Sequence, residues 1–83
     1  MNICFLMGKI LSDVEFKFII NNKKYNSISI FKLKIDENCI LTIKSYNEMA
    51  DYCYKNLIKS DYIAIYGKID SKMEIILQSV TLI

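Results

Sequence analysis

Residues 39–69 read CILTIKSYNEMADYCYKNLIKSDYIAIYGKI and carry the strongest structural signal in the chain. The two ends of this stretch, 39–46 and 62–69, alternate apolar and polar side chains, which is the period-two pattern of a half-buried β-strand. Between them the apolar residues recur at the spacing of one helix face: Ala50, Cys53, Tyr54 and Leu57. The stretch therefore predicts a strand, one helix and a second strand.

The predicted helix has two candidate N-terminal caps. Ser45 and Glu48 have the spacing of a capping box, and Asn47 is an equally suitable cap. In the strand before the helix, Leu41 and Ile43 are expected to point into the core. The residues that alternate with them are expected to point outward: Thr42, Lys44 and Tyr46.

The part of the chain before residue 36 predicts further strands. Residues 3–10 are apolar on both faces, and Gly8 among them predicts a bend or a close approach of the backbone. Phe16–Ile20 follows as a strand and ends at a polar turn over residues 21–24. In the next strand, 27–35, the apolar positions change parity at Ile30–Phe31, and we interpret this change as a β-bulge.

The order of these elements predicts the fold. A tight turn at 36–38 leads into the strand before the helix, and a turn at 70–72 joins the strand after the helix to a last strand over 73–83. Strands, one helix and a closing hairpin in this order are the connectivity of an oligonucleotide-binding (OB) barrel. We predict an all-β fold, a small five-stranded OB-fold barrel with one α-helix between strands 3 and 4.

Length and composition predict one domain and an oligomer. A chain of 83 residues forms a single core, so residues 1–83 are expected to be one OB-fold domain. A hydrophobic fraction of 53% is more than so small a monomer can bury. We therefore expect part of the apolar surface to lie in a subunit interface, and the protein to be a homo-oligomer, a dimer or a tetramer.

The lysines are concentrated in the first half of the chain. The net charge is only +2, but residues 9–34 carry six lysines against two acidic residues, a local charge of +4. A basic segment of this kind favours a phosphate-binding face. The alternative is that these lysines are simply solvated on polar strand faces.

Other chemistry is excluded by what the sequence lacks. The chain has no histidine, and Cys4, Cys39 and Cys53 have no CxxC spacing, which predicts free thiols in a reducing compartment and no metal or cofactor. No phosphate-binding glycine loop or nucleophile–base pattern is present, so no enzyme is expected. The N-terminus MNICFLMGK matches neither a signal peptide nor a membrane span, and a cytoplasmic location without membrane contact is expected.

Several fragments, in the right order along nearly the whole chain, resemble the bacterial single-stranded DNA-binding protein family. Leu6–Ile10 resembles the family's opening strand, and Asp13–Phe18 resembles its Asp-Pro-Glu-x-Arg-Tyr segment without the proline. Tyr46–Asp51 resembles the entry to its helix. Leu57–Asp61 is similar to Leu-x-Lys-Gly-Asp, and Ile63–Ile69 is similar to Val-x-Val-x-Gly-Arg-Leu. The resemblance implies a truncated relative without the acidic tail, similar in size to the primosomal replication OB proteins.

The sequence also departs from this family. The loop between the second and third strands and the last hairpin are both short, whereas the family extends them toward DNA. Ile40 and Glu74 stand where the family has tryptophans, and Tyr46 alone keeps the character of a base-stacking residue. The sequence ends at Ile83, so the family's linker and acidic tail are expected to be missing.

We predict a nucleic-acid-binding face of outward-facing lysines and tyrosines. Sequence-independent binding of single-stranded nucleic acid needs cations for the phosphates and flat aromatic rings for the bases. Two adjacent strands carry outward-facing side chains of both kinds: Lys32, Lys34, Lys44 and Tyr46. Lys9 and Lys17 are expected to border this face because the resemblance places the family's basic residues there. The full predicted set is Lys9, Lys17, Lys32, Lys34, Lys44, Tyr46, Tyr66 and Lys68.

Each of these residues also has a purely structural explanation. The lysines are suited to discourage aggregation on edge strands, and Tyr46 is suited to cover the end of the helix. Tyr62 and Tyr66 are better explained as interface or barrel-flank residues than as stacking residues. The sequence thus predicts weak single-stranded DNA or RNA binding without sequence preference, in an accessory role in replication or recombination. The alternative is an OB-fold assembly subunit that binds little or no nucleic acid.

Overall fold

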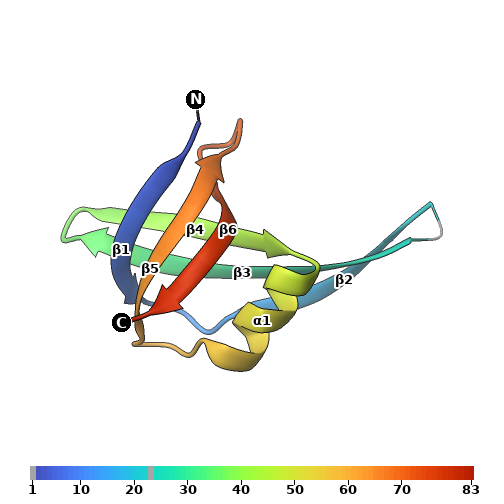
Figure 1. The fold of residues 1–83 in the computed structure, drawn as a ribbon, viewed down its shortest axis with the longest axis horizontal. Coiled ribbons are helices and arrows are strands. Elements are labelled where there is room, and N and C mark those ends of the chain that lie inside the picture. The colour runs from blue at the N-terminus through green and yellow to red at the C-terminus, as the bar shows by residue number, and fades with distance from the viewer. Residues whose placement is uncertain (1, 23) are drawn as a thin grey trace.

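The computed structural model describes residues 2–22 and 24–83, which form six strands and one helix (Figure 1). In chain order these are β1 (Cys4–Ile10), β2 (Glu15–Asn21), β3 (Lys24–Asp36), β4 (Cys39–Tyr46), α1 (Glu48–Asn56), β5 (Tyr62–Ile69) and β6 (Ile75–Leu82). The predicted turn at 21–24 lies where Asn21 pairs with Lys24, and Lys23 itself is outside the described residues. No helix in the described part of the chain is long and apolar enough to cross a membrane.

Five of the strands close into a barrel. They follow the order β1-β5-β6-β4-β3, and β3 then pairs with β1 at Lys9↔Lys34 and Ile10↔Leu33 to close the ring. The extra strand, β2, pairs only with β3, and the β2–β3 hairpin projects away from the barrel (Figure 1). The helix lies between β4 and β5, which are the third and fourth barrel strands. The predicted five-stranded OB barrel is confirmed, with β2 as an addition to it.

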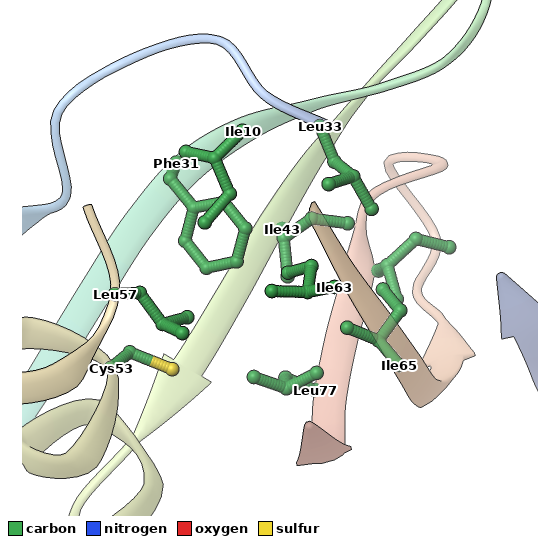
Figure 2. Close-up of a cluster of buried hydrophobic side chains, with 10 residues drawn as sticks. Ile10, Phe31, Leu33, Ile43, Cys53, Leu57, Ile63, Ile65 and Leu77 are labelled. Carbon is green, nitrogen blue, oxygen red and sulfur yellow. The ribbon is translucent and has the colours of Figure 1, made fainter. Parts of the chain in front are cut away.

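The barrel is filled by apolar side chains from all five barrel strands, most of them isoleucine or leucine (Figure 2). Phe31, Leu33 and Ile43 come from the β3–β4 pair, and Ile63 and Ile65 come from β5, all at most 1% exposed. Helix α1 covers one end of this core with two buried side chains: Ala50 and Cys53. β-branched residues pack well on a pleated, curved sheet, and this explains how a short chain fills a barrel mainly with isoleucine.

The predicted bulge at Ile30–Phe31 is wrong. The β3–β4 register runs unbroken from Ile28↔Tyr46 to Lys34↔Ile40, and the irregularity lies beyond it, between Lys34 and Asp36. The inward face of β3 is Ser27, Ser29, Phe31 and Leu33, so Ile28 and Ile30 point outward. The parity of the apolar residues changes because serines occupy the inward positions, and the strand itself stays regular.

The inward serines form a small polar cluster beneath the helix. Ser29 Oγ hydrogen-bonds Ser45 Oγ, and Ser45 Oγ lies 3.7 Å from Cys53 Sγ. Ser27 Oγ donates to the Asp51 carboxylate at 3.1 Å. The predicted Ser45–Glu48 capping box is therefore also wrong, because the Ser45 hydroxyl is committed to this cluster. Buried hydroxyls are tolerated because each finds a partner.

Asn47 occupies the N-cap position of α1 but does not cap with its side chain. Its backbone adopts a φ of 55°, and its N–H donates to the Ser27 carbonyl at 2.8 Å. Helix α1 is therefore attached to β3 through the backbone at its first turn. A positive φ is uncommon for residues other than glycine, and asparagine is among those that adopt it most often.

Barrel closure depends on Gly8. A Cβ placed on Gly8 would meet the backbone carbonyl of Lys34 well inside van der Waals contact. The predicted close approach of the backbone at this glycine is confirmed, and it occurs where β1 meets β3.

Thiol reactivity tests the position of the helix. Burial raises the pKa of the Cys53 thiol, and its side chain is fully enclosed, whereas Cys4 and Cys39 are only half-buried. Because the thiolate is the reactive form, we expect a thiol-specific reagent to modify Cys4 and Cys39 in the native protein and Cys53 only after unfolding. Mass spectrometry after timed labelling, with and without urea, checks this. Fast native labelling of Cys53 would show that α1 does not cover the barrel.

Candidate nucleic-acid interface

The outward side of the β3–β4 pair carries four of the predicted site residues. Side chains that face each other across an antiparallel pair lie on the same side of the sheet. Four cross-strand pairs point outward here: Ile28–Tyr46, Ile30–Lys44, Lys32–Thr42 and Lys34–Ile40. We call these eight residues the β3–β4 outer face. The prediction that Lys32, Lys34, Lys44 and Tyr46 share one surface agrees with this register.

Neighbouring strands extend this surface on both sides. Lys17 on β2 pairs with Ile28, so it continues the row that ends at Tyr46. On the other side, β4 pairs with β6 at Lys44↔Ile76, and β6 pairs with β5 at Lys68↔Ile76. At a strand spacing of about 4.8 Å, Lys68 lies roughly 10 Å from Lys44 across the sheet.

The remaining two predicted residues lie at different distances from this surface. Lys9 pairs with Lys34 across the β1–β3 seam, so it borders the β3–β4 outer face as predicted. Tyr66 does not join it, because Tyr66 pairs with Ser79, beyond the part of β6 that pairs with β4, whereas Lys68 pairs with Ile76. The Tyr66 ring instead packs on Phe5 of β1, with ring centroids 4.9 Å apart. The pairing of Tyr66 with Phe5 therefore places its ring on the apolar outward side of β1 and β5.

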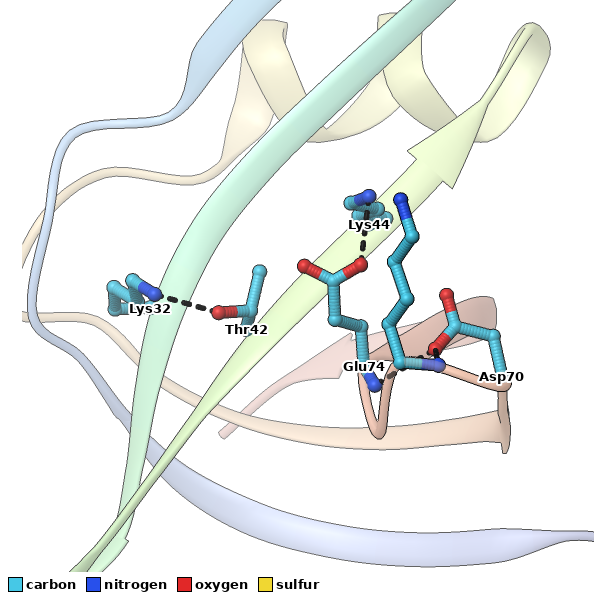
Figure 3. Close-up of polar contacts among 6 residues, drawn as sticks. Lys32, Thr42, Lys44, Asp70 and Glu74 are labelled. Carbon is cyan, nitrogen blue, oxygen red and sulfur yellow. Dashed lines mark hydrogen bonds and ion pairs between the residues drawn. The ribbon is translucent and has the colours of Figure 1, made fainter.

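An ion pair neutralises one of the lysines (Figure 3). Lys44 Nζ lies 2.7 Å from Glu74 Oε1, and both side chains are less than a quarter exposed. Hydrogen bonding to Glu74 raises the pKa of Lys44 above its usual value, so the ammonium stays charged and paired at neutral pH. The turn before β6 fixes the position of Glu74, because Asp70 Oδ1 accepts hydrogen bonds from the N–H groups of Lys72 and Glu74.

Lys32 and Lys34 are less engaged. Lys32 Nζ donates to the Thr42 hydroxyl at 2.6 Å, and among residues 2–22 and 24–83 it forms no ion pair. Lys34 Nζ lies 3.6 Å from a carboxylate oxygen of Glu37, a side chain that is 86% exposed. An exposed pair of this kind is worth little and is easily exchanged for another anion. Lys32 and Lys34 therefore carry most of the positive charge on this face that can bind an anion.

The sequence pattern missed two features of this surface. Ile28 and Ile30 add apolar contact area beside Tyr46, which was hidden because the predicted bulge put both on the same face as Phe31 and Leu33. Glu74 lies next to Lys44, a contact between β4 and the turn before β6 that no local sequence signal indicates. The face thus combines cations, one exposed tyrosine ring and isoleucine side chains. In OB barrels, the surface of the second and third barrel strands is the ligand-binding side, and β3 and β4 are those strands.

Comparisons with known proteins agree with this architecture. No protein-family model and no curated protein matches the sequence. Among solved structures, the SSB domain of a Synechococcus protein superposes with a TM-score of 0.84 at 14% identity, covering 96% of this chain and 93% of that one.

The single-stranded DNA binding protein of Thermus aquaticus is similar as well. The wild-type protein gives a TM-score of 0.83 at 16% identity over the whole of this chain. A deletion mutant of the same protein gives the same TM-score and identity. The chain spans about two fifths of the length of either form. This chain therefore has an OB fold in the form found in bacterial SSB domains.

Proposed function

We propose that the chain binds single-stranded DNA or RNA, weakly and without sequence preference, through the β3–β4 outer face. The observation that carries the proposal is the convergence of Lys17, Lys32, Lys34 and Tyr46 on one side of the barrel. This is the combination of backbone cations and a stacking ring that single strands require. It also lies on the strands that OB folds use for ligands. The similarity to SSB domains supports the proposal through the fold.

We propose that the protein acts in the cytoplasm by binding and without catalysis. Its proposed role is accessory to DNA replication or recombination. Weak binding is proposed because the face offers one tyrosine, and isoleucines stand where further aromatic rings would strengthen stacking. Each stacked base contributes about 1–3 kcal/mol.

A titration with fluorescent oligo(dT) tests the proposal, with intrinsic tyrosine emission as a second readout. Four lysines of this surface, Lys17, Lys32, Lys34 and Lys68, correspond to a slope of about −3 in a plot of log K against log salt. Affinity is thus expected to fall about 50-fold between 50 and 200 mM salt, with tyrosine quenching on binding. Absence of binding in low salt, or binding insensitive to salt, would contradict the proposal.

Removing the Glu74 carboxylate is expected to strengthen binding. In Glu74→Gln the amide keeps the size of the side chain but releases the Lys44 ammonium for a phosphate. We expect about fivefold tighter oligo(dT) binding in low salt and a salt slope steeper by about 0.7. The same titration measures both quantities.

Glu48→Gln is the matched control, because it makes the same change in net charge on helix α1. Glu48 lines a shallow pocket with Met49, Tyr52 and Val80 and is not one of the eight residues of the β3–β4 outer face. If both variants strengthen binding equally, net charge alone explains the gain and Lys44 is not part of the face.

A second candidate function, a self-associating or assembly subunit, rests on the outward side of β1 and β5. Ile3, Phe5 and Met7 are each more than half exposed, and Tyr66 is 49% exposed beside Phe5. A contiguous apolar surface of this kind is typical of an interface. We propose that it supports a dimer or tetramer. Light scattering after size exclusion tests this: Phe5→Glu should yield a monomer, and an unchanged mass, or a wild-type monomer, would contradict it.

A further inference from the structure

The β3–β4 hairpin crosses β1 (Figure 1). A groove of about 590 Å³ lies where β1 meets β3, and its lining includes Met7, Lys9, Lys34, Glu37, Tyr62 and Ile83. We call it the seam groove. Its volume is in the range of sites that hold a small organic ligand.

Two like charges face each other at this groove. Lys9 and Lys34 are direct register partners across the β1–β3 seam. Like charges in opposite positions of a strand pair destabilise it, so barrel stability does not account for this arrangement. In the described part of the chain Lys9 has no ion pair, and Lys34 has only the exposed Glu37. A phosphate between the two ammonium groups would remove the repulsion.

An aromatic ring stands beside these charges. Tyr62 on β5 pairs with Lys9 in register, its ring is 58% exposed, and Lys9 Nζ lies 5.9 Å from the ring centroid. Met7 and Ile83 give the groove apolar walls and are 52% and 69% exposed. A flat ring, apolar walls and two cations match the base and the phosphate of one nucleotide.

The seam groove is also continuous with the β3–β4 outer face. Lys34 belongs to both, and along β3 it lies six residues, or about 20 Å, from Ile28. A single-stranded nucleic acid bound along the lysines of β3 therefore reaches the groove after Lys34. The groove also adjoins the apolar patch around Phe5, because Met7 belongs to both.

We propose that the seam groove is a nucleotide subsite, in which Lys9 and Lys34 hold a phosphate of the bound single strand and Tyr62 stacks on its base. This inference rests on the proposed function, because the occupant is part of the same strand. It adds Tyr62 to the binding residues and lengthens the path of the strand from the sheet face to the barrel seam.

Photocrosslinking tests the subsite. Oligo(dT) containing 5-iodouracil is irradiated with the wild-type protein, and the adducts are located by fragmentation mass spectrometry. Adducts are expected on Tyr62 as well as on Tyr46. Tyr62→Ala should weaken oligo(dT) binding about 5- to 150-fold, the range of one lost stacked base. Tyr62→Phe should restore the affinity because it keeps the ring.

Tyr52→Ala is the control, since Tyr52 lies on helix α1, outside both the seam groove and the apolar surface of β1 and β5, and is 42% exposed against 58% for Tyr62. Its affinity should equal that of the wild type. If the wild type binds oligo(dT) but Tyr62 gives no adduct, and Tyr62→Ala binds like Tyr52→Ala, the subsite is refuted and the proposed function survives. If the wild type does not bind at all, both are refuted.

Discussion

Tyr46→Ala is expected to weaken oligo(dT) binding about 5- to 150-fold, because it removes the only aromatic ring on the β3–β4 outer face in the described structure. One stacked base is worth about 1–3 kcal/mol, and each 1.4 kcal/mol is tenfold in affinity. The salt slope should stay unchanged, since no cation is lost. Fluorescence anisotropy of a labelled oligonucleotide measures both quantities.

Tyr52→Ala is the control for this prediction. Tyr52 lies on helix α1 and is 42% exposed, against 41% for Tyr46, so both variants delete the same side chain at the same exposure. Tyr52→Ala should bind like the wild type. Equal losses in the two variants, or none in either, would remove Tyr46 from the proposed interface and leave the fold unaffected.

Phe31→Ala is expected to destabilise the barrel by about 3–5 kcal/mol. Phe31 is 1% exposed and belongs to the buried core cluster together with Ile10 and Ile43 (Figure 2). Domains of this size are stable by about 5–15 kcal/mol in total, so the loss is a large part of the free energy of unfolding. Urea denaturation followed by circular dichroism measures it.

Phe18→Ala is the matched deletion on the projecting hairpin. Phe18 is 70% exposed and contacts Phe16 edge to face, so the same substitution should cost less than about 1 kcal/mol there. A loss at Phe18 as large as the loss at Phe31 would mean that the hairpin, and not the barrel, carries the stability of this chain.

The sequence was sufficient for the barrel because its apolar residues follow strand and helix periods in an order that few folds share. It failed at β3, where Ser27 and Ser29 take inward positions and Ile28 and Ile30 take outward ones. Periodicity arguments assume that apolar residues mark the interior. That assumption fails over residues 27–30, where serines lie inward and isoleucines outward. The inward hydroxyl of Ser29 is satisfied by Ser45, which lies beside Cys53.

The site could be predicted only where strand register fixes the positions of side chains. Alternation along each strand correctly placed Lys32, Lys34 and Lys44 on the outward side. It could not reveal that Glu74 neutralises Lys44. That contact joins β4 to the turn before β6, and the parallel pairing of β4 with β6 leaves no local signal in the sequence. Tyr66 was grouped with the lysines because outward alternation does not say which side of a closed barrel a strand occupies.

Amide chemical shifts of the ¹⁵N-labelled protein, followed by NMR during titration with oligo(dT), locate the bound strand on the protein surface. We expect the largest changes on the β3–β4 outer face, at Lys32, Lys34, Lys44 and Tyr46, and we expect them to reverse when salt is added. Changes confined to helix α1 or to the outward side of β1, or no changes at saturating oligonucleotide, would contradict this expectation.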